Sequence, residues 1–130
     1  MTAFAERRRF PRVARELSVK LSSDTFDLIA ETQNISAAGV NCLVNRSLPV
    51  MTRLAMMILL PTQRGGKPGT RQIRCEGVVV RSEPTSARNQ DMPQYETAVY
   101  FSGIRATDQD AIKRYVKQQT AETQQALESL

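Results

Sequence analysis

The first fifteen residues contain most of the excess positive charge of this 130-residue chain. They hold five arginines and one acid, a net charge of +4, while the other residues carry thirteen basic and twelve acidic side chains. The arginines are Arg7, Arg8, Arg9, Arg12 and Arg15. A guanidinium group is a planar fork of donors that suits phosphate, carboxylate and the O6/N7 edge of guanine. Charge gathered on one short segment favours a single anionic ligand over a broad basic surface. The alternative is a solvated basic tail.

A second group of polar residues follows in the stretch Asn34-Ile-Ser36-Ala-Ala-Gly39. If a strand continues through this stretch, Asn34 and Ser36 project to one face and Ile35 points into the core. Gly39 ends the stretch, where a positive φ or a close backbone approach would require glycine. The alternative is an ordinary turn between strands, stabilised by its own Asn and Ser side chains.

The sequence argues against catalysis and against a resident cofactor or metal. It has no histidine, the commonest general base and metal ligand. Gly65-Gly66-Lys67 departs from a phosphate-binding loop because Pro68 stands where a hydroxyl residue is needed. Cys42 and Cys75 have neither metal-site nor redox spacing and are expected to be buried, reduced and inert. We therefore expect a binding protein, not an enzyme.

The elements that must position these groups begin with an arm. Pro11 disfavours a helical conformation at Phe10, so residues 1–15 are expected to be extended or turning and partly mobile without a ligand. Strand-like runs follow, with apolar residues alternating at a period of two. They cover residues 17–21, 25–35, 39–44, 52–60, 71–83 and 95–102; the segment 61–70 is predicted to be a hairpin loop and 84–94 another loop.

The fourth run and the C-terminal segment are expected to pack together. Residues 52–60 are apolar on both faces, which predicts that something covers the outside of the sheet there. From Thr107, which is predicted to cap a helix, apolar residues recur at spacings of three and four. The turn from Ile112 to Val116 is the expected cover.

These elements predict an all-β fold, a six-stranded antiparallel β-barrel with a C-terminal α-helix. The organisation is an arginine-rich arm over residues 1–15, a barrel with the start of the helix over 16–116, and a polar helix end over 117–130. No secretion signal is recognisable, and the longest apolar run is too short to span a bilayer, so a cytoplasmic location is expected.

Taken together, Arg8-x-x-x-Arg12 and Asn34-x-Ser36-x-x-Gly39 resemble the PilZ domain of bacteria, whose pattern is Arg-x-x-x-Arg followed by Asp/Asn-x-Ser-x-x-Gly. Both motifs are complete, and the resemblance extends from about Glu6 to Val116. It implies a stand-alone receptor domain that binds the second messenger cyclic di-GMP on the outer surface, where arm and barrel meet.

The resemblance also implies roles by position. Arg8 and Arg12 would bind phosphates and guanine, Asn34 and Ser36 would hydrogen-bond a guanine, and Gly39 would let the backbone approach closely. Arg7 stands where some family members carry an extra arginine and bind two intercalated ligand molecules, which favours a ligand dimer.

Ligand binding would order the arm and alter the interaction with a downstream protein, which the sequence does not identify. Two other functions stay open. One is a ligand-independent adaptor domain with the same fold. The other is a small barrel that binds nucleic acid, which the scarcity of aromatic residues (5%) and the nearly neutral body disfavour.

Overall fold

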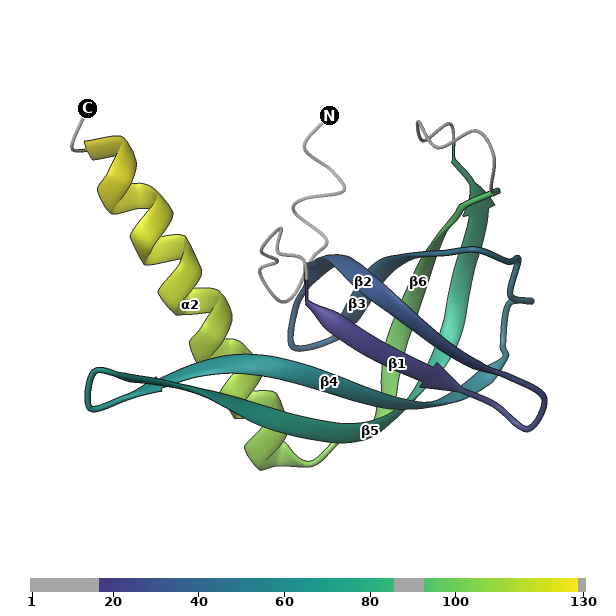
Figure 1. Ribbon diagram of the computed structural model, residues 1–130, viewed down its shortest axis with the longest axis horizontal. Coiled ribbons are helices and arrows are strands. Elements are labelled where there is room, and N and C mark those ends of the chain that lie inside the picture. Colours follow the sequence, from purple (N-terminus) through teal and green to yellow (C-terminus); the bar gives the residue numbers. More distant parts are fainter. Residues whose placement is uncertain (1–16, 86–92, 129–130) are drawn as a thin grey trace.

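Six antiparallel strands close into a ring and are followed by one helix (Figure 1). This computed structural model describes residues 17–85 and 93–128, with side chains described as far as residue 121. The elements are β1 (Ser18–Ser22), β2 (Asp27–Ile35), β3 (Gly39–Val44), β4 (Arg53–Arg64), β5 (Lys67–Pro84), β6 (Tyr95–Gly103) and α2 (Ala106–Glu128). The predicted six-stranded barrel with a C-terminal helix is confirmed.

The ring closes through two pairings between strands that are distant in sequence. The order around the barrel is β1-β2-β3-β6-β5-β4, so β1 pairs with β4 and β3 pairs with β6. Val19 lies opposite Ile58 in the first pairing, and Val40 lies opposite Val99 in the second. All four side chains are buried, since alternate residues of each strand point into the same core.

Both cysteines contribute to this core, as expected. They are free and buried. Burial raises the pKa of the Cys42 thiol to about 12, and it raises the pKa of Cys75 to about 11 with help from the charges of Asp108 and Glu76. The reactive thiolate is therefore scarce at neutral pH.

The outer face of β4 is not covered, contrary to the sequence-based expectation. Leu59 is 41% exposed and Ala55 is exposed, while the inward residues of the strand are buried. The helix does contact β4, but Ile112 and Val116 join the cluster that contains the inward side chains of the strand. An apolar residue on each face of a strand therefore did not require a layer on each face.

The predicted hairpin between the fourth and fifth strands is confirmed, but its loop is shorter than residues 61–70 because the strands continue through most of this range. Arg64 pairs with Lys67, so only Gly65 and Gly66 form the turn. Their φ values of 58° and 77° are those of a type I′ hairpin. The pairing of β4 with β1 ends at Ile58. Beyond that residue, β4 and β5 project from the ring as a two-stranded hairpin. Prolines 61 and 68 fit there because each strand has a neighbour on one side only.

The helix begins at Ala106, so the predicted cap at Thr107 is wrong by position. Asp108 lies in the first turn and is 1% exposed. Arg71 of β5 donates to its Oδ1 from Nε and Nη2 at 3.0 and 2.8 Å, and Arg105 donates to its Oδ2 at 3.3 Å. Two guanidinium groups thus compensate one buried carboxylate and attach the start of α2 to the barrel. Within the described part of the chain, no helix is both long and apolar enough to cross a membrane.

Candidate functional site

Half of the predicted site residues lie on the folded barrel. Asn34, Ser36 and Gly39 are at the end of β2, in the following turn and at the start of β3. Arg7, Arg8 and Arg12 lie outside the described residues. The geometry of the site is therefore built from the barrel side.

The turn between β2 and β3 is held by Ser36. Its backbone N–H donates to the carbonyl of Gly39 at 2.9 Å, and its Oγ accepts the N–H of Ala38 at 3.1 Å. Ser36 is 1% exposed. The ordinary turn stabilised by its own side chains, which the sequence left open as the alternative, is therefore present. The Ser36 hydroxyl still has its own proton, which it can donate to another group.

β2 ends at Ile35, so only Asn34 lies on the outer strand face. Ile35 is fully buried and Asn34 is half-buried, whereas a strict period of two from the buried Ala30 and Thr32 would place Asn34 inside and Ile35 outside. The pairing of β2 with β3 shifts between Thr32 and Asn34, which places Asn34 opposite Asn41. A shift of this kind re-aims the side chains at the end of a strand.

Asn41 is a polar residue of this surface that the motifs did not reveal. Its Oδ1 atom is buried and has no hydrogen-bond partner in the part of the chain that the structure describes. A buried amide oxygen without a donor carries a desolvation cost, so an unpaired one needs an explanation. Its position was accessible from sequence: a turn over 36–39 pairs Ile35 with Val40, and the next pair is Asn34 with Asn41.

Gly39 is required by the approach of two strands and not by a left-handed φ. The glycines with positive φ in the described residues are Gly65 and Gly66. A Cβ on Gly39 would collide with the carbonyl oxygen of Val99 and lie 3.1 Å from the Cα of Tyr100. The glycine of the motif therefore lets β3 lie against β6.

The turn is also connected to the helix. Gln109 of α2 donates from Nε2 to the carbonyl of Ala37 at 2.9 Å, and the N–H of Phe101 donates to the carbonyl of Ala38 at 2.9 Å. One end of the candidate site thus contacts the first turn of α2 and the strand that precedes it. In the described residues, no group of three His, Cys, Asp or Glu side chains is placed to hold a metal ion.

Comparison with known proteins gives one family and several similar structures. The PilZ domain family model matches residues 6–118. The structure of the Bacillus subtilis inhibitor of motility MotI is 25% identical, with a TM-score of 0.73 over 89% of this chain and 52% of that one. The PilZ domain of Escherichia coli YcgR with c-di-GMP is 11% identical, with a TM-score of 0.66 over 95% of this chain and 99% of that one.

The structural matches differ in what they support. At 11% identity the YcgR domain shows the fold alone, and this chain spans about half the length of MotI. MrkH, described as a c-di-GMP-dependent transcription regulatory factor, is 15% identical with a TM-score of 0.58 over 90% of this chain and 51% of that one. A comparison with curated protein sequences finds no match.

Replacing Gly39 by alanine is expected to destabilise the barrel. The new Cβ meets backbone atoms, so β3 and β6 must separate, at a cost of about 2–3 kcal/mol in the free energy of unfolding. Urea denaturation measures the change. Gly69→Ala is the matched control because its Cβ would lie 3.2 Å from the Thr62 Oγ1 atom, which can move. Equal stability of the two variants would contradict the strand-approach role.

Proposed function

Since the chain belongs to the PilZ domain family, we propose that it is a receptor for cyclic di-GMP. The observation that carries the proposal is the extent of the family match, residues 6–118, which contains the complete arginine motif and the complete Asn-x-Ser-x-x-Gly turn. The match of the fold to the c-di-GMP-containing YcgR domain supports it.

The chemistry of the ligand fits the residues available. Cyclic di-GMP carries two phosphate charges and two guanine bases. Arginines bind phosphate and the O6/N7 edge of guanine and stack on flat rings, which gives Arg8 and Arg12 these roles. Arg7 directly before the motif favours two intercalated ligand molecules. No catalytic step is part of this function, and the chain uses no cofactor in it.

On the barrel, the proposed contacts are polar groups held by a rigid strand end. Asn34 projects from the outer face of β2, and the Ser36 hydroxyl has a proton left after accepting from Ala38. In our proposal these two groups hydrogen-bond a guanine. Gly39 acts indirectly, because it sets the distance between β3 and β6 beside the turn.

We add Asn41 to the proposed ligand contacts. The Watson–Crick edge of guanine presents N–H donors. Directly across from Asn34, the buried Oδ1 of Asn41 is an acceptor that has no partner among the described residues. A guanine at Asn34 would supply the missing donor. This assignment explains why an unpaired polar atom is retained at this position.

The proposed mechanism is a transition of the arm from mobile to ordered. The ligand bridges the arginines of residues 1–15 and the turn on the barrel, and the ordered arm changes the surface offered to a downstream protein. The hydrogen bond from Gln109 to Ala37 gives the turn a direct connection to α2, which is a second element that can respond.

Calorimetric titration with cyclic di-GMP tests the receptor function. We expect binding that the Arg8→Ala/Arg12→Ala variant loses, because each charged hydrogen-bond partner contributes roughly 1.5–3 kcal/mol, or about ten- to a hundredfold in affinity. The stoichiometry decides between one and two ligands per chain. A folded wild-type protein that binds nothing would overturn the proposal in favour of the adaptor function.

The Asn41→Ala variant separates a ligand contact from a structural role. We expect the affinity for cyclic di-GMP to fall about three- to tenfold, while the free energy of unfolding without ligand stays equal or rises because a desolvated oxygen is removed. Asn45→Ala, at an exposed position just after β3, is the control. Lower stability with unchanged affinity would show that Asn41 serves the fold instead.

Amide hydrogen exchange tests the proposed ordering of the arm. Exchange over residues 5–15 is expected to slow at saturating ligand, because bridged arginines restrict the backbone that carries them. Residues of β5 provide the internal reference. Unchanged exchange over 5–15 in a protein that binds the ligand would reject the bridging mechanism and leave the receptor function standing.

A further inference from the structure

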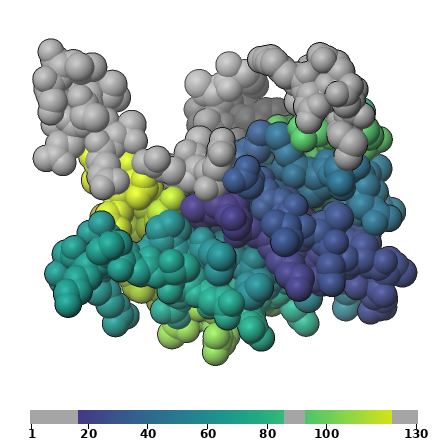
Figure 2. Space-filling model, viewed as in Figure 1, coloured from purple at the N-terminus to yellow at the C-terminus, as the bar shows by residue number. Residues whose placement is uncertain are grey.

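A large open cleft lies between the projecting β4–β5 hairpin and α2. Its volume is about 980 Å³, and its walls come from residues 61–71 of the hairpin and 111–121 of the helix. In the space-filling view the end of the hairpin lies beside the helix, away from β1 and β2 (Figure 2). The cleft shares no residue with Asn34, Ser36, Gly39 or Asn41.

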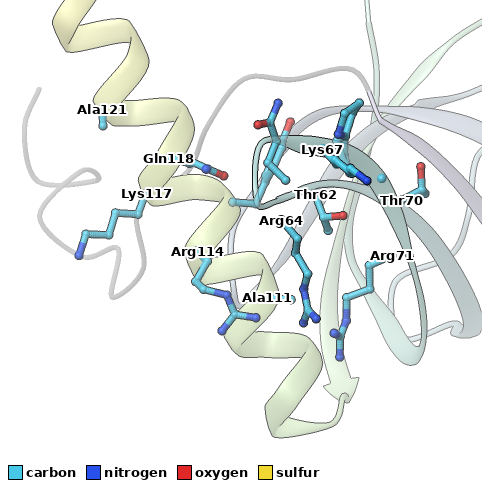
Figure 3. A pocket seen from close by; sticks show the side chains of 15 residues that line it. Thr62, Arg64, Lys67, Thr70, Arg71, Ala111, Arg114, Lys117, Gln118 and Ala121 are labelled. Carbon is cyan, nitrogen blue, oxygen red and sulfur yellow. The ribbon is translucent and has the colours of Figure 1, made fainter.

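The charge of the cleft has one sign among the residues whose side chains the structure describes. Five of these are basic and line the cleft, and none that lines it is acidic; the five are Arg64, Lys67, Arg71, Arg114 and Lys117. Arg64 on the hairpin and Arg114 on the helix extend toward the same part of the cleft from its two walls (Figure 3). Like charges that face one another repel, and an anion between them removes that cost.

The five basic residues are not equally available. Arg71 is already paired with the buried Asp108 at 2.8 Å. The other four are exposed, and none of them forms an ion pair with any residue in the described ranges. The cleft therefore has four uncompensated cations, although outside the first fifteen residues the chain carries a net charge of only +1.

The cleft also has an apolar side. Pro61 and Pro68 of the hairpin and Ala111 and Tyr115 of the helix contribute to its lining. Prolines on a strand give a stiff apolar surface without N–H donors. Cations that surround apolar groups complement a ligand that is both acidic and amphipathic. A free phosphate would use the cations and leave this apolar lining unoccupied.

We propose that this cleft is a docking site for an acidic, amphipathic segment of a partner protein. Carboxylates of the segment lie between Arg64 and Arg114, and its apolar side chains rest on the exposed Pro61 and Pro68. Single-stranded nucleic acid fits less well, because it needs exposed aromatic rings for stacking and the one aromatic ring of the cleft, that of Tyr115, is buried. A second copy of this chain fits poorly because its net charge is +5. The proposal does not depend on the binding of cyclic di-GMP.

Fluorescence anisotropy with defined probes tests the site. The probe is a labelled peptide of repeated Glu-Glu-Leu, compared with Lys-Lys-Leu of the same length and with a single-stranded oligonucleotide. We expect the full-length chain to bind the acidic peptide, to bind it more weakly as salt rises, and to ignore the basic peptide. The Arg64→Glu/Arg114→Glu variant is expected to lose about tenfold or more in affinity.

The control variant is Lys20→Glu/Arg53→Glu, which changes the net charge equally at exposed positions outside the cleft. Its affinity for the peptide should lie within about twofold of the wild-type affinity when the two are compared at the same salt concentrations across a salt titration, which separates the general effect of net charge. Thermal unfolding monitors the fold of both variants. Equal loss in both variants, or no loss in a folded Arg64→Glu/Arg114→Glu protein, would overturn the cleft as the site. Tighter binding of the oligonucleotide than of the acidic peptide at the same salt would overturn the acidic protein as its partner.

Discussion

The close backbone approach of Gly39 to Val99 is the constraint on which the barrel and its candidate site both depend. β3 and β6 are distant in sequence, and their pairing is one of the two that close the ring. A side chain at position 39 would occupy the space of the Val99 carbonyl. The same glycine ends the turn that begins at Ser36, so the closure of the barrel and the shape of the turn are fixed at one point.

Hydrogen bonds connect the turn to β6 and to the start of α2. The carbonyls of Ala37 and Ala38 accept from Gln109 and from the N–H of Phe101. The start of α2 is in turn attached to β5 through Asp108 and Arg71. The turn is therefore linked to the first turn of α2 by a single hydrogen bond, the one from Gln109 to Ala37. None of these hydrogen bonds involves the C-terminal half of the helix.

Compensation of charge distinguishes the structural arginines from those available for binding. Asp108 is buried, so it needs Arg71, and that pair serves the packing of the helix. Arg64 and Arg114 are exposed, and neither forms an ion pair with another residue in the part of the chain that the structure describes. Because the hairpin extends beyond β1, its basic end stands apart from the ring and faces the helix, as Figures 1 and 3 show.

The sequence by itself determined the number of strands, the inward residues where the strands are regular, and the C-terminal helix, because a period of two or of 3.6 depends on local geometry alone. It also located the Asn34–Gly39 turn and, through both motifs, the family. Only the tertiary structure decided why Gly39 is a glycine and that the Oδ1 atom of Asn41 is buried without a partner among the described residues. It likewise decided that β4 and β5 run through the predicted loop and that four cations gather around one cleft. These features depend on pairing register and on contacts between distant segments, and local periodicity carries no information about either.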